Sequence, residues 1–347
     1  VVNPYTKEAY FDFDLFKKHV ALAQRIMDDI IDLELEKIEK IIAKIDSDPE
    51  SEEVKEAEKH LWEKIYKKSG QGRRTGVGIT AEGDMLAAMG LRYGTEEATE
   101  FSEQVHKTIA LEAYRSSVNM AKERGAFAIY DSEREKNNPF INRLKEADPE
   151  LYEEMKKYGR RNNACLTIAP TGTTSLMTQT TSGIEPVFMP VYKRRRKVNP
   201  NDPQTHVDFV DETGDAFEEY IVFHHKFVEW MTVNGYDPTK RYTQEEIDKL
   251  VEKSPYYKAT SNDVDWLMKV KMQGRIQKWV DHSISVTINL PNDVDEALVN
   301  RLYVEAWRSG CKGCTVYRDG SRSGVLLSTK KDKKDKKEEL PSCKPPT

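Results

Sequence analysis

The sequence has 347 residues, 38% of them hydrophobic and 33% charged, which is enough apolar material for one large α/β domain or two ordinary ones. Its 54 basic and 59 acidic residues give a net charge of −5, so the charge balance does not suggest a nucleic-acid or anionic-membrane partner. No run approaches the roughly 18 apolar residues of a membrane-spanning helix, and four cysteines do not make a secreted disulfide framework. We therefore expect a cytoplasmic protein.

The N-terminal part of the sequence has a helical pattern. Apolar residues recur every three or four positions from residue 12 to residue 46, which predicts one or two amphipathic helices. The charged stretch 47–58 predicts a surface turn, and 59–68 a further helix. The chain begins Val-Val-Asn-Pro, with neither an initiator methionine nor a signal or transit peptide. We interpret it as a segment of a longer protein.

Glycines punctuate residues 70–80, ahead of helix formers at 81–89. Gly76, Gly78 and Ala81 match the spacing of a dinucleotide-binding fingerprint. That fingerprint requires a hydrophobic strand before it and a βαβ unit around it, and the sequence shows neither. Dinucleotide binding is therefore disfavoured.

Helical patterns continue through the middle of the chain. Residues 95–124 predict a long helix that ends at Gly125, a residue type common just after helix C-termini. A short strand is predicted at 127–130. Residues 138–158 predict a mostly helical stretch that ends at Gly159.

An apolar strand pattern runs into a hydroxyl-rich turn at residues 166–177, which read Leu-Thr-Ile-Ala-Pro-Thr-Gly-Thr-Thr-Ser-Leu-Met. This order predicts a buried strand, a tight loop and a helix start. Such a loop can hold an anion, because glycine allows close backbone approach and the N–H groups at a helix start point outward with the positive end of the dipole. Serine and threonine also occur where a turn only caps a helix, and the residue types alone leave both interpretations open.

Strands and helices alternate through the rest of the chain, as in a parallel sheet or barrel with crossover helices. The five basic residues 193–197 predict a solvated loop, with contact to phosphates as the alternative. His224 and His225 are adjacent, so on a helix they point to different sides and cannot share a metal. The predicted strands are 187–192, 283–290 and 315–317, and the predicted helices are 217–233, 263–280 and 293–309.

The C-terminal end has a different composition. Lysine pairs alternate with acidic residues from 330 to 339, and such a segment cannot bury a core. We predict a structured domain at 1–328 and a charged, disordered linker at 329–347.

Three stretches together resemble the large chain of ribonucleotide reductases, and agree best with the adenosylcobalamin-dependent (class II) branch. They are Arg160-Arg161-Asn162, the loop at 169–175 and Ser182-Gly183-Ile184-Glu185-Pro186. The resemblance covers about residues 5–328 and implies a helix-rich α/β fold, the second half of a ten-stranded α/β barrel, in which 73–78 would be a strand. It also implies that the loop holds the phosphates of the ribonucleotide substrate. The residues concerned are Pro170, Thr171, Gly172, Thr173 and Thr174, with Ser175 adjacent.

The resemblance also implies which chemistry lies outside this sequence. In the family, the thiyl radical forms on a finger loop within an Asn-x-Cys-x-Glu motif, and these 347 residues contain no such motif. We therefore assign no catalytic residue and expect no turnover by this chain alone. Cys165, in a predicted buried strand, is interpreted as core. Cys311 and Cys314 could form a redox pair or half a zinc site, but packing is favoured because no histidine lies nearby. Cys343 alone indicates neither a shuttle thiol nor a zinc ligand.

The tyrosines in the region of the final predicted strand distinguish between the possible cofactors. Class I enzymes carry adjacent tyrosines there, whereas this sequence has Tyr317 alone, which favours adenosylcobalamin. The resemblance implies a ribonucleotide substrate, the N-terminal half of the barrel in the same or another polypeptide, and a homo-oligomer when complete. Two alternatives remain. The chain could be the non-catalytic half of a split reductase, with sheet edges and apolar helix faces that bind a partner, or an unrelated phosphate-binding α/β enzyme.

Overall fold

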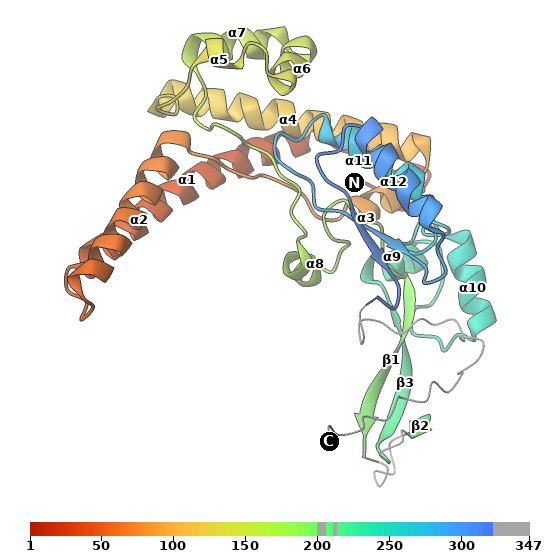
Figure 1. Cartoon of the computed structure of the whole chain (residues 1–347). Helices are drawn as coiled ribbons and strands as arrows, with labels where there is room; N and C mark the ends of the chain where they lie inside the picture. Colours follow the sequence, from red (N-terminus) through yellow and green to blue (C-terminus); the bar gives the residue numbers. More distant parts are fainter. Residues whose placement is uncertain (200–205, 211–213, 322–347) are drawn as a thin grey trace. The chain divides into compact units, whose positions relative to one another are not determined.

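The computed structural model describes residues 1–199, 206–210 and 214–321, which fall into two compact units. Unit 1 comprises Val1–Pro190 and His224–Asp319, and Val191–Phe223 belong to unit 2 (Figure 1). The predicted linker at 329–347, with Cys343, lies outside the described residues. Within the described part, no helix combines the length and the apolar character needed to cross a bilayer.

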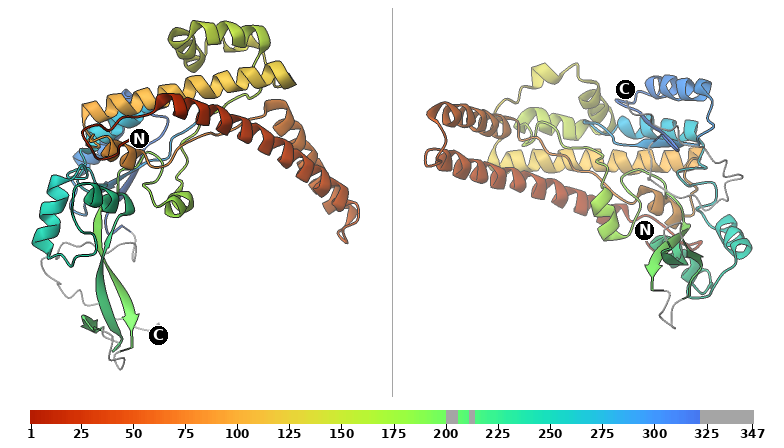
Figure 2. Two further views of the ribbon diagram at one scale, coloured as in Figure 1. Left: turned by 180° about the vertical axis from the view of Figure 1, so that it is seen from behind. Right: turned by 60° about the horizontal axis from the view of Figure 1, so that its bottom comes forward.

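Long helices dominate the N-terminal part of unit 1. α1 (Phe13–Ile45) is a single helix that packs against both α2 (Glu52–Gly72) and α4 (Glu96–Arg124) (Figure 2). The surface turn predicted at 47–58 is shorter than expected and ends at Ser51. The Ser51 hydroxyl accepts a hydrogen bond from the N–H of Val54, and the two glutamates that follow it favour the positive end of the helix dipole.

The other helices of unit 1 are shorter. They are α3 (Glu82–Ala88), α5 (Ser132–Glu135), α6 (Pro139–Ala147), α7 (Pro149–Tyr158), α8 (Gly172–Thr178), α9 (His225–Val233), α10 (Gln244–Lys253), α11 (Trp266–Gln277) and α12 (Glu296–Arg308). The helical stretch predicted at 138–158 divides at Asp148, because Pro149 lacks the N–H that would continue the first helix. The strand predicted at 127–130 is wrong. This segment is a turn in which the N–H of Tyr130 donates to the carbonyl of Phe127 at 3.0 Å.

Parallel pairings join segments that lie far apart in the sequence. Val77 pairs with Leu166, Ile168 pairs with Ile284, and β4 (Thr287–Leu290) pairs with β5 (Thr315–Arg318). The predicted strand 283–290 is therefore a single bridge at its start and a regular strand at its end. These pairings and the crossover helices give a mixed, helix-rich α/β fold. Closure into a ten-stranded barrel is not seen among the described residues.

Two glycines allow the first of these pairings. A Cβ on Gly78 would lie 2.2 Å from the carbonyl oxygen of Thr167, and one on Gly76 would lie 2.8 Å from that residue's Cγ2. The N–H of Thr167 donates to the carbonyl of Val77 at 2.9 Å, so the two backbones are held together at this point. The glycines that match a dinucleotide fingerprint thus serve close strand packing.

Unit 2 is an antiparallel arrangement of β1 (Val191–Val198), β3 (Ala216–Phe223) and β2 (Phe209–Val210), in that order. Three predictions for this segment were wrong. The basic run 193–197 lies within β1 and not in a loop, and the strand predicted at 187–192 begins only at Val191. The first part of the helix predicted at 217–233 is β3, because its residues pair with β1 along their whole length. Acidic residues of unit 2 neutralise three of the basic ones, in the ion pairs Lys193–Glu219, Arg196–Glu218 and Lys197–Asp215.

Candidate functional site

The loop between Ile168 and α8 forms the centre of the candidate site. Its backbone turns at Thr171, which has a φ of +50°, and the N–H of Ser175 donates to the carbonyl of Thr171 at 2.8 Å. The predicted loop and helix start are thus confirmed, whereas the predicted buried strand before them is reduced to two isolated parallel bridges, at Leu166 and Ile168. Gly172 is exposed, and a Cβ placed on it would meet no atom within 4 Å. The loop therefore presents an open face to its surroundings.

The predicted site residues divide into an open group and a supporting group. Gly172, Thr173 and Thr174 are exposed, and across the described ranges neither their N–H groups nor the two threonine hydroxyls make a hydrogen bond. Pro170 is also exposed and fixes one backbone angle ahead of the turn. The open group offers up to about five donors to an incoming oxyanion.

The hydroxyls of Thr171 and Ser175 instead form hydrogen bonds within the protein. The Thr171 hydroxyl accepts from the N–H of Gly183 at 2.7 Å. The buried Ser175 hydroxyl donates to the carbonyl of Gly172 at 3.0 Å and lies 2.7 Å from the hydroxyl of Ser182. The segment 182–186, whose sequence resembled the reductases, therefore supports the loop directly.

The end of that segment joins the loop to the sheet. The Glu185 carboxylate accepts from the N–H of Thr287 at 2.6 Å and from the Lys269 ammonium at 2.5 Å. Lys269 is 1% exposed and also donates to the Thr287 carbonyl at 2.6 Å. The phenol of Tyr93 donates to the carbonyl of Ile184 at 2.6 Å. Glu185 is thus a structural connection to β4, and its charge is balanced.

Sequence analysis missed a polar cluster behind the loop. Asp84 of α3 is 3% exposed, and its carboxylate contacts the N–H of Thr181, the phenol of Tyr256 and the imidazole of His224. The phenols of Tyr5 and Tyr256 lie 3.4 Å apart. The only signal in the sequence was a pair of acidic residues, Glu82 and Asp84, at the start of a helix that is otherwise apolar. His224 faces this carboxylate from the N-terminus of α9.

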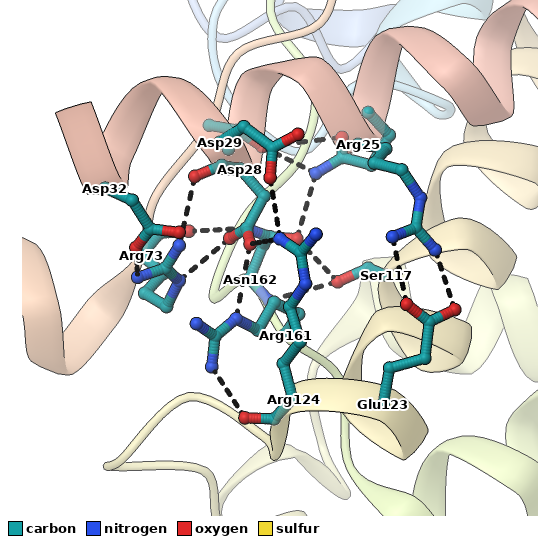
Figure 3. Close-up of polar contacts among 12 residues, drawn as sticks. Arg25, Asp28, Asp29, Asp32, Arg73, Ser117, Glu123, Arg124, Arg161 and Asn162 are labelled. Atoms are coloured by element: carbon teal, nitrogen blue, oxygen red, sulfur yellow. Dashed lines mark hydrogen bonds and ion pairs between the residues drawn. The ribbon is translucent and has the colours of Figure 1, made fainter.

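A second acidic cluster, on α1, has the donor types of a metal site. Carboxylate oxygens of Asp28, Asp29 and Asp32 lie within 4.8 Å of one another. Asp28 is fully buried and meets the Arg73 guanidinium at 2.8 Å and that of Arg161 at 3.2 Å (Figure 3).

The wider cluster, together with Glu123, holds four acidic groups and four arginines. The further ion pairs are Asp32–Arg73, Asp29–Arg124 and Glu123–Arg25 (Figure 3). Burial would raise the pKa of Asp28, but the hydrogen bond and charge of Arg73 and the charge of Arg161 outweigh it and hold that pKa below its ordinary value. The cluster is a balanced structural network, and it leaves no unneutralised charge for a cation.

The Arg160-Arg161-Asn162 motif has a structural role in the same region. The Asn162 amide donates to Asp28 at 2.8 Å, and its carbonyl oxygen accepts from the hydroxyl of Ser117 at 2.8 Å (Figure 3). The buried Arg160 guanidinium is paired with Glu135. The motif therefore fixes the start of the strand that leads to the loop.

The three described cysteines are all free thiols. Cys165 is fully buried, as expected for a core residue, and burial raises the pKa of its thiol well above the ordinary value. Burial, followed by the charge of Cys314, raises the pKa of Cys311 to about 12. The Cys311 thiol donates to the carbonyl of Val270, and both Cys311 and Cys314 pack against the core beside β4. Thiols that stay protonated are poor nucleophiles, which supports packing over redox chemistry.

Known proteins resemble this chain over most of its length. The vitamin B12-dependent ribonucleoside-diphosphate reductase of Mycobacterium tuberculosis (strain CDC 1551 / Oshkosh) is 28% identical over 325 residues, 92% of this chain and 38% of the relative. The corresponding protein of Thermoplasma acidophilum is 29% identical over 332 residues, 95% of this chain and 36% of the relative. A ribonucleoside-diphosphate reductase subunit alpha of Chlamydia pneumoniae is 24% identical over 341 residues, 91% of this chain and 29% of the relative.

The chain thus spans little more than a third of the length of the first two relatives. The family described as "Ribonucleotide reductase, barrel domain" matches residues 1–317, nearly all of the described chain. This match extends over both long N-terminal helices, the hydroxyl-rich loop and most of β5. The chain therefore belongs to the ribonucleotide reductase barrel domain family.

Proposed function

We propose that this chain is the part of a ribonucleotide reductase that holds the phosphates of the substrate at the loop formed by residues 170–175. The observation that supports the proposal most strongly is the open face of Gly172, Thr173 and Thr174, which has unpartnered N–H and hydroxyl donors within the described structure. These donors follow the bridged segment 166–168 of a reductase-family domain. Phosphate oxygens are acceptors that match such a set, and no lysine is needed.

The reaction proposed for the complete enzyme is reduction of a ribonucleotide to a deoxyribonucleotide by thiyl-radical chemistry. This chain contributes binding and orientation of the substrate through its anionic end. It supplies no residue that we assign to the radical step, since the sequence contains no Asn-x-Cys-x-Glu motif. On its own, the chain is expected to bind substrate without turning it over.

The names of two relatives call them vitamin B12-dependent, and the family resemblance suggests adenosylcobalamin as the cofactor that would supply the radical in the complete enzyme. Two cavities among the described residues, of about 540 and 600 Å³, are lined by both polar and apolar side chains and do not single out a corrin site. We assign no residue of this chain to cofactor binding.

The proposed partner is the other half of the barrel, in the same polypeptide or a separate one. One face of α1 carries exposed apolar side chains at helical spacing, namely Leu15, Leu22, Ile26, Ile30 and Leu33. Leu176 and Met177 of α8 are 80% and 81% exposed. Apolar surfaces of this kind mark contacts with further protein. A homo-oligomer of the complete enzyme is proposed on family resemblance alone.

Reconstitution tests the proposal. The chain is mixed with a polypeptide that carries the finger-loop half, adenosylcobalamin, a dithiol and a ribonucleotide, and deoxyribonucleotide formation is followed. We expect product, and we expect Gly172→Asp to abolish it because a carboxylate then occupies the open face. Gly313→Asp is the matched control, since Gly313 is also exposed with open space around its Cβ.

Two outcomes would contradict the proposal. Equal product from wild type and Gly172→Asp would reject the phosphate role of the loop. Absence of product from halves shown to be folded and associated would favour the second candidate function, a structural or binding subunit of a split reductase. The exposed apolar face of α1 is the observation that keeps this candidate open.

A further inference from the structure

A carboxylate behind the loop connects three distant parts of unit 1. The Asp84 Oδ2 atom accepts from the N–H of Thr181 at 2.7 Å. Its Oδ1 atom accepts from the phenol of Tyr256 at 3.0 Å and lies 2.8 Å from the Nε2 atom of His224. The phenol of Tyr5 in turn lies 3.4 Å from the phenol of Tyr256. Asp84 is thus surrounded by donors from segments 97 to 172 residues away.

The contacts of Asp84 continue to the proposed phosphate loop. Thr181 donates its N–H to Asp84 and also accepts two hydrogen bonds at its carbonyl oxygen. The donors are the hydroxyl of Thr80, at 2.8 Å, and the N–H of Ala81, at 2.9 Å. Two residues further on, the N–H of Gly183 donates to the Thr171 hydroxyl at 2.7 Å. Segment 181–183 is therefore clamped between α3 and the residue at which the loop turns.

We propose that Asp84 is a positioning residue for the loop at 171–175, and that His224 and Tyr256 orient its carboxylate. The inference rests on the proposed function, because it concerns the same loop. A carboxylate suits this place because it accepts several hydrogen bonds at once, and those to a charged acceptor are stronger than neutral ones. Thr171 has a positive φ, which an L residue adopts only when its surroundings hold it there. The Asp84 contacts supply that restraint through segment 181–183.

The simpler interpretation is that Asp84 only satisfies buried polar groups, and a matched carboxylate separates the two. Asp281 has the same kind of contacts at the opposite end of the strand that leads to the loop. It accepts from the N–H groups of Cys165 and Leu166 at 2.7 and 2.9 Å and from the phenol of Tyr114 at 2.8 Å. Loss of either carboxylate should lower stability, but only loss of Asp84 should disturb the loop.

The experiment uses the full 347-residue chain. Affinity for inorganic pyrophosphate is measured by calorimetry for wild type, Asp84→Ala, Asp84→Asn and Asp281→Asn, and amide hydrogen exchange is followed at Thr181 and Gly183. We expect Asp84→Ala to weaken affinity by about tenfold or more and to speed exchange at both amides. Asp84→Asn retains one acceptor and should lie between Asp84→Ala and wild type. Asp281→Asn should match wild type in affinity and in exchange at these two amides.

A second pair of variants tests the orienting role. His224→Gln keeps an N–H donor for Asp84 and should remain near wild type, whereas His224→Phe removes it and should approach Asp84→Ala. If Asp84→Ala is folded and binds pyrophosphate as wild type does, Asp84 is structural only and the inference is wrong. If wild type binds no pyrophosphate, the proposed function of the loop fails. In that case the hydrogen-exchange rates still test whether Asp84 positions the loop. Unchanged exchange at Thr181 and Gly183 in Asp84→Ala would refute that role.

Discussion

Replacement of Asp28 by asparagine should be among the most destabilising conservative changes in this chain. Asp28 is fully buried, and its carboxylate meets three guanidinium groups, those of Arg73 at 2.8 Å, Arg161 at 3.2 Å and Arg124 at 3.6 Å. Asparagine can still accept from one of them, but its amide N–H group then faces the others. Four arginines would remain with three acidic partners, and the charge would be lost at the fully buried centre of the cluster.

The size of the effect follows from this imbalance. Removal of one partner from a buried ion pair costs about 3–5 kcal/mol, and the remaining acceptor oxygen of asparagine places Asp28→Asn near the lower value. A loss of about 3 kcal/mol is a large part of the roughly 5–15 kcal/mol by which domains are stable. With a urea dependence of about 1–3 kcal/mol per molar, the unfolding midpoint should fall by about 1 M or more.

Urea unfolding at neutral pH, followed by circular dichroism, measures this difference. Asp32→Asn is the control, because Asp32 pairs with Arg73 at the exposed edge, where its side chain is 47% exposed. It should cost less than about 1 kcal/mol. The pKa of Asp28 is lowered by folding, so its stabilisation is complete above its unfolded pKa and is lost only as the pH falls through the folded value. A cost below about 1 kcal/mol for Asp28→Asn at neutral pH would refute the reasoning.

Three further outcomes are expected. Burial raises the pKa of the Glu82 carboxyl, so protonated Glu82 favours the folded state below its unfolded pKa, and this contribution is lost as the pH rises through the folded pKa. The thermal stability of Glu82→Gln should therefore exceed that of wild type at about pH 8, and the difference in stability should become smaller toward about pH 4. Gly78→Ala should lower the unfolding free energy by about 1–3 kcal/mol in urea titrations, because its Cβ would lie 2.2 Å from a carbonyl oxygen, whereas Gly313→Ala has no such contact and should remain near wild type. Cys311, whose thiol pKa is raised to about 12 by burial, should react with iodoacetamide at neutral pH more slowly than a free cysteine; an equal rate would show that the thiol is not held in the core.

Local sequence signals predicted the loop but could not predict the contacts that support it. Glycine, proline and hydroxyl residues between an apolar strand and a helix are a short-range pattern, and the structure places α8 at the expected position. The cluster around Asp84 depends on residues 140 and 172 positions away, and no periodicity carries that information. Its members were visible in the sequence only as single polar residues in helices or turns.

The errors in secondary structure have the same cause. Residues 217–223 carry apolar side chains that suit a helix or a strand, and pairing with β1 decides for the strand. The basic residues of β1 are likewise tolerated in a strand because β3 and its approach carry acidic partners. Helix ends marked by a cap, such as Asp12 and Thr95, were predicted closely, because the capping side chain and the helix start are neighbours in sequence.

The most direct test of the proposed phosphate role of the loop is a titration of the isotope-labelled chain with a ribonucleoside diphosphate, followed by backbone amide NMR. We expect the largest chemical-shift changes at the N–H groups of Gly172, Thr173 and Thr174, and we expect these changes to disappear in Gly172→Asp but to persist in Gly313→Asp. Binding that leaves these three amides unchanged and shifts residues elsewhere would contradict the claim that this loop holds the substrate phosphates.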